Sequence, residues 1–220
     1  DWIGRNMFGR VEVAWPVLFI AGMGLLEPLA AALPAGGAQD AGVGASTADA
    51  ALPLIEKGIA RFEKEGCDAI VAFGGGSPMD AAKTIALAVA NRKHPRQLVG
   101  YFKGRRAPVP IYAVPTTAGT GSEVTVAAVV SDPQTNRKLV IADTRLVPAM
   151  AALDPALMTG LPRPVTAATG MDALTHAVEA YVSRFAQPLT DRFALDAIAM
   201  IAAALPTAVH NGADIAARET

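Results

Sequence analysis

The chain of 220 residues has a single cysteine, Cys67, which excludes an internal disulfide. Charged residues make up 18% of the sequence, below the roughly 25% of ordinary domains, and the formal net charge is −1. Because the chain has no excess of Lys and Arg, we expect neither nucleic acid nor a membrane surface as a partner. The lack of disulfides favours a cytoplasmic protein. Cys67 precedes a predicted buried strand, so we expect it in the core and not as a reactive thiol.

Long apolar runs are also missing. A spanning helix needs about 18 apolar residues in succession, and the nearest stretch, 11–26, contains Glu12, Pro16 and two glycines. The first residues lack the basic segment, apolar run and cleavage site of a secretory signal. The chain begins with Asp1 and not with methionine, and we expect it to be incomplete.

Apolar residues make up 52% of the chain, enough for a substantial core. Short apolar runs predict strands, and helical spacing of apolar residues predicts helices. The predicted strands are 17–20, 68–73, 110–115 and 150–154, with a strand pair at 123–132 and 137–143. The predicted helices are 25–34, 47–66, 77–91, 162–183 and 188–209, and the Gly- and Ala-rich stretch 35–47 is predicted to be a loop.

The order of these elements predicts an α/β fold. Strands that are unbroken apolar runs and alternate with helices indicate a mainly parallel sheet covered on both faces. From about residue 156 only helices are predicted, which indicates a second domain that begins near residue 158.

The stretch IVAFGGGSPMDAAK (70–83) predicts a strand, a triple-glycine turn and a helix. We expect Ser77 to cap the helix, Pro78 to occupy its first position and Asp80 to complete a capping box. Glycines let backbone N–H groups approach a ligand, and a helix N-terminus attracts anions, so the turn suits a pyrophosphate. The pattern is neither GxGxxG nor a Walker A loop, and a plain tight turn is the alternative.

A second loop of small residues, VPTTAGTGSEVT (114–125), follows another predicted strand. In an open parallel sheet, loops beyond the carboxyl ends of the strands face the ligand crevice. The two loops therefore suit opposite ends of one dinucleotide, although a polar turn is the simpler interpretation of the second loop alone. Lys138 has the reach for a phosphate or ribose, or is a solvated lysine at a strand end.

An acidic residue and a histidine lie one turn apart in GMDALTHAVEAY (170–181). Asp172 and His176 have the i, i+4 spacing that places two side chains on one helical face. A carboxylate and an imidazole suit Fe²⁺ or Zn²⁺, but two ligands do not make a tight site. A polar stripe that includes Thr175 and Glu179 is the alternative.

Three motifs, GGGSPMDAAK, PTTAGTGSEVT and ATGMDALTHAVEAYVS, together resemble the iron-containing (group III) alcohol dehydrogenases. The resemblance runs from about Ile55 to the end. It implies a Rossmann-like dinucleotide-binding α/β domain over 1–157 and the beginning of a helical metal-binding domain over 158–220. It also implies a small alcohol or aldehyde as substrate, NAD or NADP as cofactor, Fe²⁺ or Zn²⁺ as Lewis acid, and a homo-oligomer.

The site residues that the resemblance implies are those that match the family's motifs. The cofactor-binding positions are Gly75, Gly76, Ser77, Pro78 and Met79 in the pyrophosphate loop, Thr116, Thr117 and Thr120 in the second loop, and Lys138, Leu157 and Met158. Asp172 and His176 match the first two metal ligands. No side chain is assigned as a general base.

The chain also departs from the family. Two further histidine ligands are expected on helices beyond this sequence, and neither His94, in a polar loop, nor His210, at a helix end, matches them. The stretch 35–47 is too short for the family's second strand, VGAST (43–47) replaces a PNPT-like turn, and Asp40 receives no role. A non-catalytic nucleotide-binding remnant and a glycerol dehydrogenase- or dehydroquinate synthase-like enzyme remain alternatives, and the alcohol and the choice between NAD and NADP stay open.

Overall fold

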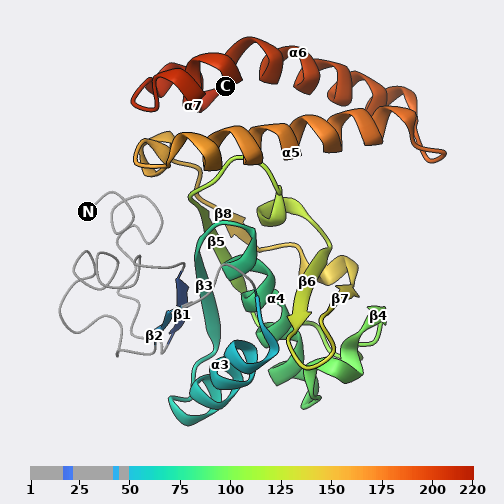
Figure 1. Ribbon diagram of the computed structural model, residues 1–220. Helices are drawn as coiled ribbons and strands as arrows, with labels where there is room; N and C mark the ends of the chain where they lie inside the picture. Colours follow the sequence, from blue (N-terminus) through green and yellow to red (C-terminus); the bar gives the residue numbers. More distant parts are fainter. Residues whose placement is uncertain (1–16, 22–41, 45–49) are drawn as a thin grey trace. The chain divides into compact units, whose positions relative to one another are not determined.

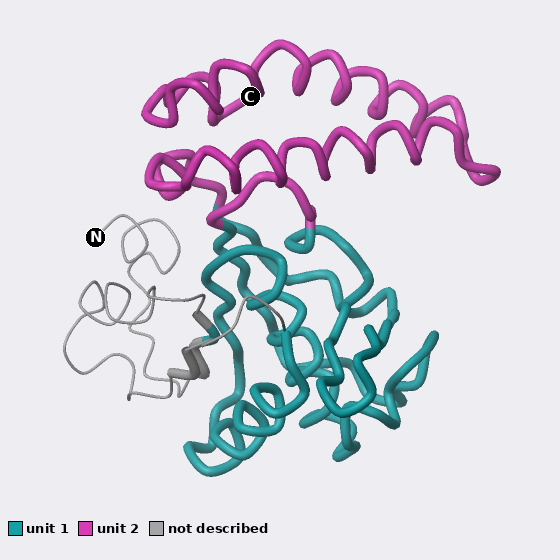
Figure 2. The backbone as a smooth tube through the Cα atoms, viewed as in Figure 1, with its two compact units in different colours: residues 1–115, 122–152 teal, residues 116–121, 153–220 magenta. Residues whose placement is uncertain are grey.

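The computed structural model describes residues 17–21, 42–44 and 50–220. These fall into two compact units (Figure 2). The sheet unit comprises the described residues of 1–115 and 122–152, and the helical unit comprises 116–121 and 153–220. The predicted helix at 25–34 and Asp40 lie outside the described residues.

A five-stranded parallel sheet forms the centre of the sheet unit (Figure 1). Its strand order is β2-β1-β3-β5-β8, with all neighbours parallel. The bounds are β1 Val17–Ala21, β2 Gly42–Gly44, β3 Ala69–Gly74, β5 Ile111–Pro115 and β8 Met150–Ala151. The predicted α/β class with a parallel sheet is thus confirmed.

The edge strand β2 corrects the prediction that all of 35–47 is loop and too short for a strand. Residues Gly42–Gly44 pair with Phe19–Ala21 in parallel register. Glycine and valine in a three-residue run give a weak strand signal, and the backbone of a neighbouring strand supplies the pairing that propensity does not.

Two helices cover this sheet, α3 (Leu52–Lys64) and α4 (Gly76–Asn91). The apolar side of α3 buries Leu52, Ile55 and Phe62. The helix begins at Leu52 and not at the predicted 47, and it ends at Lys64, just before the predicted stop Gly66, whose φ of 64° favours glycine. Helix α4 packs against β1, β3 and β5, and most of its length is buried. All six residues of β3 are buried, as expected for a central parallel strand.

Cys67 lies in the core cluster just before β3, as predicted. Burial raises the pKa of its thiol, and the neighbouring carboxylates of Glu65 and Asp68 act in the same direction. A thiol with a raised pKa is a poor nucleophile, so the residue fills space in the core.

A second sheet has the strand order β4-β7-β6. Strands β6 (Ala127–Asp132) and β7 (Arg137–Ala142) form the predicted antiparallel pair, while β4 (Gly100–Tyr101) pairs in parallel with β7 and was not predicted. The predicted strand start at 123 is wrong, because residues Ser122–Val124 form the short 3₁₀ helix η2. Helix α4 contacts β6 as well as the larger sheet, so it joins the two sheets.

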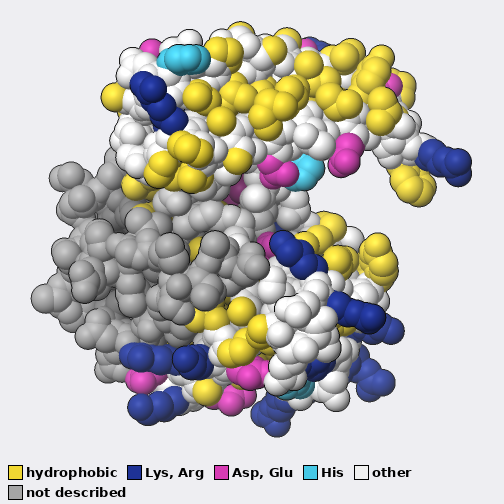
Figure 3. All heavy atoms as spheres, in the orientation of Figure 1, with side chains coloured by type: hydrophobic (Ala, Val, Ile, Leu, Met, Phe, Trp, Pro, Cys, Tyr) yellow, Lys and Arg dark blue, Asp and Glu magenta, His cyan; other side chains and the backbone are white. Residues whose placement is uncertain are grey.

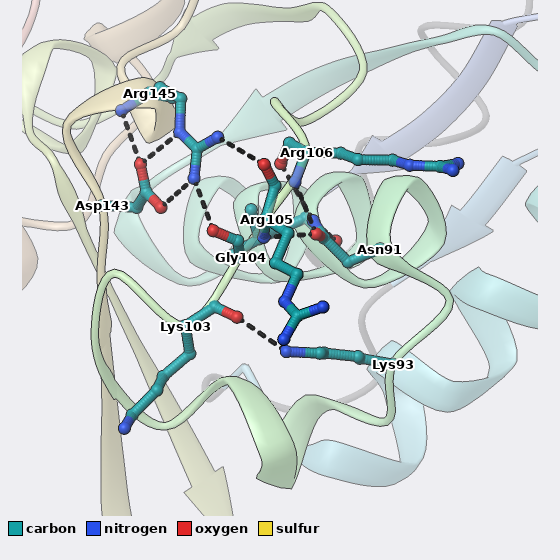
Figure 4. A network of polar contacts seen from close by, with 9 residues as sticks. Asn91, Lys93, Lys103, Gly104, Arg105, Arg106, Asp143 and Arg145 are labelled. Carbon is teal, nitrogen blue, oxygen red and sulfur yellow. Dashed lines mark hydrogen bonds and ion pairs between the residues drawn. The ribbon is translucent and has the colours of Figure 1, made fainter.

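Two further 3₁₀ helices of this unit are η1 (Pro95–Leu98) and η3 (Thr144–Leu146). Next to η3, the carboxylate of Asp143 binds the guanidinium of Arg145, which also donates to the backbone oxygen of Gly104 at 2.8 Å (Figure 4). The Asn91 side chain, at the end of α4, accepts hydrogen bonds from the backbone N–H groups of Arg105 and Arg106 at 2.6 and 2.7 Å. Side chains therefore hold the loop between β4 and β5 by its backbone.

The helical unit contains η4 (Pro155–Met158), α5 (Arg163–Val182), α6 (Pro188–His210) and α7 (Ile215–Glu219). The two long helices agree closely with the predicted 162–183 and 188–209. They pack against each other at Gly170, where a Cβ would lie 2.3 Å from Cδ1 of Leu205. The buried Arg218 of α7 donates to the Thr166 hydroxyl of α5 at 3.1 Å, which ties the short last helix to the pair.

Large apolar side chains lie exposed along α5, α6 and their connection. Figure 3 shows them as a band on the helical unit, and Val182, Phe185, Leu189 and Phe193 are each more than 60% exposed. By length and composition α6 is apolar enough to cross a membrane, with a mean hydropathy of 1.6 over an 18-residue window of which 11% is buried. Helices whose apolar face packs on other protein have the same composition, so the expectation of no membrane partner stays a prediction.

Candidate cofactor and metal site

The triple-glycine turn joins β3 directly to α4. Gly74 ends the strand with φ 145°, a conformation that favours glycine, Gly75 occupies the N-cap position, and the helix begins at Gly76. Ser77 is therefore inside the first turn, and no side chain caps the helix. The predicted Ser77 cap and the predicted Pro78 start are wrong, because the glycines continue into the helix itself and place the cap at Gly75 and the start at Gly76, two residues earlier. A helix start without a side-chain cap suits an anion that accepts hydrogen bonds from its backbone N–H groups.

Asp80 does not complete a capping box. Its carboxylate reaches across to the segment after the second loop, accepting from the Ser122 hydroxyl at 2.8 Å and from the backbone N–H of Val129 at 2.9 Å. Burial raises the pKa of Asp80, opposed by these two hydrogen bonds and by nearby lysines. The long-range partners compete successfully with the local cap, and sequence spacing alone does not reveal them.

Lys83, which follows one turn later, is fully buried. Its ammonium donates to Ser122 Oγ and to the backbone oxygen of Thr125, both at 2.9 Å, and contacts Thr125 Oγ1 and the backbone oxygen of Ala127 at 3.0 Å. Burial lowers the pKa of Lys83 to about 8, against the attraction of Asp80 and Glu123. The motifs predict no role for Lys83. Its one sequence signal is a lysine on the apolar side of an otherwise buried helix.

The other predicted pyrophosphate-loop residues differ in exposure. Gly75, Gly76 and Ser77 are partly exposed, whereas Pro78 and Met79 are buried. Met79 belongs to the core cluster of the sheet unit, with 1% of its surface exposed. A ligand at the turn therefore meets the glycine backbone and Ser77, while the Met79 side chain packs behind them.

The second loop, 116–121, leaves β5 at Pro115, which pairs in the sheet with Gly74. Thr116 is buried, Thr117 is half-buried and Thr120 is exposed. Within the helical unit Gly119 lies against α5, where a Cβ would come within 2.6 Å of the backbone oxygen of Thr169. The loop therefore has no room for a side chain at this position.

Three further predicted cofactor residues lie on other elements. Lys138 is exposed on β7 of the sheet unit. Leu157 and Met158 are half-buried in η4 of the helical unit. Each stays a prediction from the motif.

Asp172 and His176 lie on one face of α5, as their spacing predicts. His176 Nε2 is 3.7 Å from Asp172 Oδ1, and the two side chains are 52% and 44% exposed. Ligand atoms that each lie about 2.0–2.2 Å from one ion are this close together, so the pair fits as two members of a metal-ligand set. Among the described residues, no group of three or more His, Cys, Asp or Glu side chains converges on one point.

The other two histidines contact other residues. His94 is exposed in its polar loop, as its sequence context predicts, and there its Nε2 lies 3.0 Å from Glu56 Oε1 and its Nδ1 accepts from the backbone N–H of Arg96. His210, as predicted, lies at a helix end, where its Nδ1 is 2.7 Å from the backbone oxygen of Pro206. Neither is grouped with Asp172 and His176.

Comparison with known proteins gives two family matches. The model described as iron-containing alcohol dehydrogenase matches residues 16–155, and that of the C-terminal region of Fe-containing alcohol dehydrogenases matches residues 166–220. The NAD-dependent methanol dehydrogenase of Bacillus methanolicus is 42% identical over 91% of this chain and 53% of its own length. The 1,3-propanediol dehydrogenase of Citrobacter freundii is 47% identical over 75% of this chain and 43% of its own length.

Solved structures also match the chain. A 1,3-propanediol oxidoreductase matches with a TM-score of 0.88 and 37% identity, over 100% of this chain and 59% of that one. A sulfoacetaldehyde reductase of Bifidobacterium kashiwanohense in complex with NAD⁺ matches with a TM-score of 0.83 and 28% identity, over 99% of this chain and 57% of that one. The chain thus spans about half the length of the curated relatives and somewhat more than half of the solved chains.

Proposed function

Because the chain belongs to the iron-containing alcohol dehydrogenase family, we propose that it contributes the nucleotide-binding part and two metal ligands of an NAD(P)-dependent alcohol dehydrogenase or aldehyde reductase. The proposed division is a dinucleotide-binding domain over 1–157 and the start of a metal-binding domain over 158–220. The proposed substrate is a small alcohol or aldehyde, and the proposed setting is a cytoplasmic homo-oligomer.

One observation carries the nucleotide-binding proposal: the triple-glycine turn leads into a helix that no side chain caps. The glycine backbone offers N–H donors, and the helix dipole adds a partial positive charge. We assign Gly75, Gly76 and Ser77 to the pyrophosphate, with Pro78 and Met79 setting the shape of the turn. We assign the hydroxyls of Thr116, Thr117 and Thr120, together with Lys138, Leu157 and Met158, to the rest of the cofactor.

The carboxylate of Asp172 and the imidazole of His176 are proposed to hold Fe²⁺ or Zn²⁺. Such an ion, when bound, acts as a Lewis acid that polarises the substrate oxygen. The chain's own contribution is to orient the dinucleotide through its two loops and so to fix the geometry of hydride transfer. No side chain among the described residues is assigned as a proton acceptor.

The second candidate function is a non-catalytic nucleotide-binding protein. It is favoured by the small ligand set, because Asp172 and His176 are joined by no third metal-binding side chain among the described residues. A third candidate is a glycerol dehydrogenase-like enzyme, which the family matches favour less than the alcohol dehydrogenase.

Titration calorimetry with NAD and NADP, with and without Fe²⁺ or Zn²⁺, separates these functions. We expect the purified 220-residue chain to bind a dinucleotide and to oxidise alcohols at no useful rate. Metal-dependent activity should appear when the C-terminal region of a relative is added. Dinucleotide binding that Fe²⁺ or Zn²⁺ does not change, with or without the added C-terminal region, would favour the non-catalytic protein. Robust alcohol oxidation by the chain alone would contradict the expected dependence on further metal ligands.

A matched pair of variants tests the metal ligands. Asp172→Asn and His176→Ala should weaken metal binding, measured by competition with a chelating dye. Glu179→Gln, on the same face of α5 but without a motif match, is the control and should bind metal like the unmodified chain.

A further inference from the structure

Lys83 is the largest fully buried charged side chain among the described residues. A buried ammonium is costly unless hydrogen bonds replace its water. Four oxygens do so here, and all four belong to residues 122–127, some 40 positions along the chain: Ser122 Oγ, Thr125 O, Thr125 Oγ1 and Ala127 O. The lysine therefore bonds α4 to one particular segment.

Asp80 makes a second connection between the same two elements. The Ser122 hydroxyl accepts from Lys83 and donates to Asp80, so one hydroxyl joins both charged groups. Asp80 also accepts from the backbone N–H of Val129 in β6. We call Asp80, Lys83 and Ser122 the charged clamp. Its members lie in the sheet unit.

The clamp lies beside both predicted cofactor loops in the sequence. Asp80 follows the triple-glycine turn by one helical turn, and Ser122 directly follows the second loop, 116–121. The other end of that loop is fixed as well, because Pro115 pairs with Gly74 in the sheet. Within the sheet unit, strand pairing thus holds Pro115, the residue before the second loop, and the charged clamp holds Ser122, the residue after it.

We propose that the charged clamp is a positioning device for the dinucleotide: Lys83 and Asp80 do not contact the cofactor but hold Ser122, the sheet-unit residue that follows the second loop, at the spacing from the glycine turn that cofactor binding requires. This inference rests on the proposed function, since it assumes that both loops bind one dinucleotide. It assigns a role to a buried lysine and a half-buried carboxylate that simple stabilisation does not require, because apolar residues of similar volume often stabilise a core as well or better.

The test compares stability with cofactor affinity in four variants. Lys83→Met keeps the length of the side chain and removes the ammonium, and Ser122→Ala removes only the shared hydroxyl. Thr84→Val is the buried control on the same helix, because the Thr84 hydroxyl donates within α4, to the backbone oxygen of Asp80. Lys64→Met controls for the loss of one positive charge, because the Lys64 side chain is 81% exposed on α3.

Circular dichroism gives the melting temperature of each variant, and titration calorimetry with NAD and NADP, well below melting, gives the dissociation constant of the folded protein. We expect Lys83→Met and Ser122→Ala to weaken dinucleotide binding, the former by about tenfold or more, which corresponds to ~1.4 kcal/mol. Thr84→Val should lower the melting temperature and leave the dissociation constant unchanged. Lys64→Met should change neither.

Equal affinity in the unmodified chain, Lys83→Met and Ser122→Ala would overturn the positioning role, even if both variants melt earlier. If Lys83→Met does not fold, Ser122→Ala decides by the same criterion. If the unmodified chain binds neither NAD nor NADP, the proposed function fails and the clamp's role fails with it. The two failures are therefore distinguishable.

Discussion

At the scale of single residues, Asp143 shows how one contact sets a protonation equilibrium. Its carboxylate is almost fully buried and lies 2.6 Å from the Arg145 guanidinium. Hydrogen bonds from the Arg145 side chain hold the pKa of Asp143 below its usual 3.8, although burial acts in the opposite direction. In the folded chain this carboxylate therefore stays charged at a pH where the unfolded chain has bound a proton.

This difference predicts an acid dependence of stability. A folded pKa below the unfolded one adds stability that is complete above the unfolded pKa and disappears as the pH falls through the folded pKa. Asp143→Asn should therefore lower the free energy of unfolding at pH 7 and reduce its fall below pH 3.8. Urea unfolding between pH 7 and 3 measures this. The control is Asp196→Asn, at a side chain that is 65% exposed. If Asp143→Asn and the unmodified chain lose stability in parallel below pH 4, the ion pair contributes nothing to the acid dependence.

At the scale of elements, the end of α4 and the loop before β5 depend on one side chain. Asn91 accepts from two backbone N–H groups and donates to the backbone oxygen of Arg106 at 3.0 Å (Figure 4). Asn91→Ala removes these bonds and should cost about 1 kcal/mol of unfolding free energy. Hydrogen exchange at residues 104–107 should accelerate more than exchange in β3. Lys93→Ala, which removes a single bond to the backbone oxygen of Lys103, should have the smaller effect. Unchanged exchange at 104–107 in Asn91→Ala would show that the loop holds its shape without the side chain.

The sequence predicted most elements because their signals are local. Apolar runs located β1, β3 and β5, and helical spacing located α5 and α6 to within a residue or two of their ends. The glycine-rich β2 and the two-residue β4 were missed because their strand character comes from a neighbouring backbone and not from their own side chains.

The candidate site was predictable only in part, for a related reason. Motifs located both loops and the Asp172–His176 pair, but the spacing of Ser77 and Asp80 predicted a capping box that does not form. Asp80 instead binds Ser122 and Val129, more than 40 residues away. Partners at that distance depend on the packing of α4 against β6, which no local pattern encodes.

At the scale of the whole molecule, the helical unit carries several large apolar side chains that are mostly exposed, and such side chains often mark an interaction surface. Phe185 is 89% exposed, and Leu189 and Phe193 are 63% exposed each. We expect the purified chain to bind an apolar fluorescent dye and to associate as its concentration rises. Leu189→Gln with Phe193→Gln should reduce both effects with little change in melting temperature, because neither side chain is buried.

Dye fluorescence and sedimentation velocity measure these effects. The control is Phe62→Gln, at a buried side chain of the sheet unit, which should lower the melting temperature by the cost of placing an amide in the core. If the double variant associates as strongly as the unmodified chain, the contact surface lies elsewhere.

The lone Cys67 gives this chain a built-in reporter. Its sulfur is enclosed beside β3 and resists ionisation, so a maleimide reaches it only when the surrounding helices and strands part. The rate of labelling, followed by mass spectrometry, would then report how often the core around Cys67 opens, without any introduced probe. The same labelling rate, measured with nucleotide present, would show how strongly a ligand at the glycine turn suppresses opening of the sheet unit.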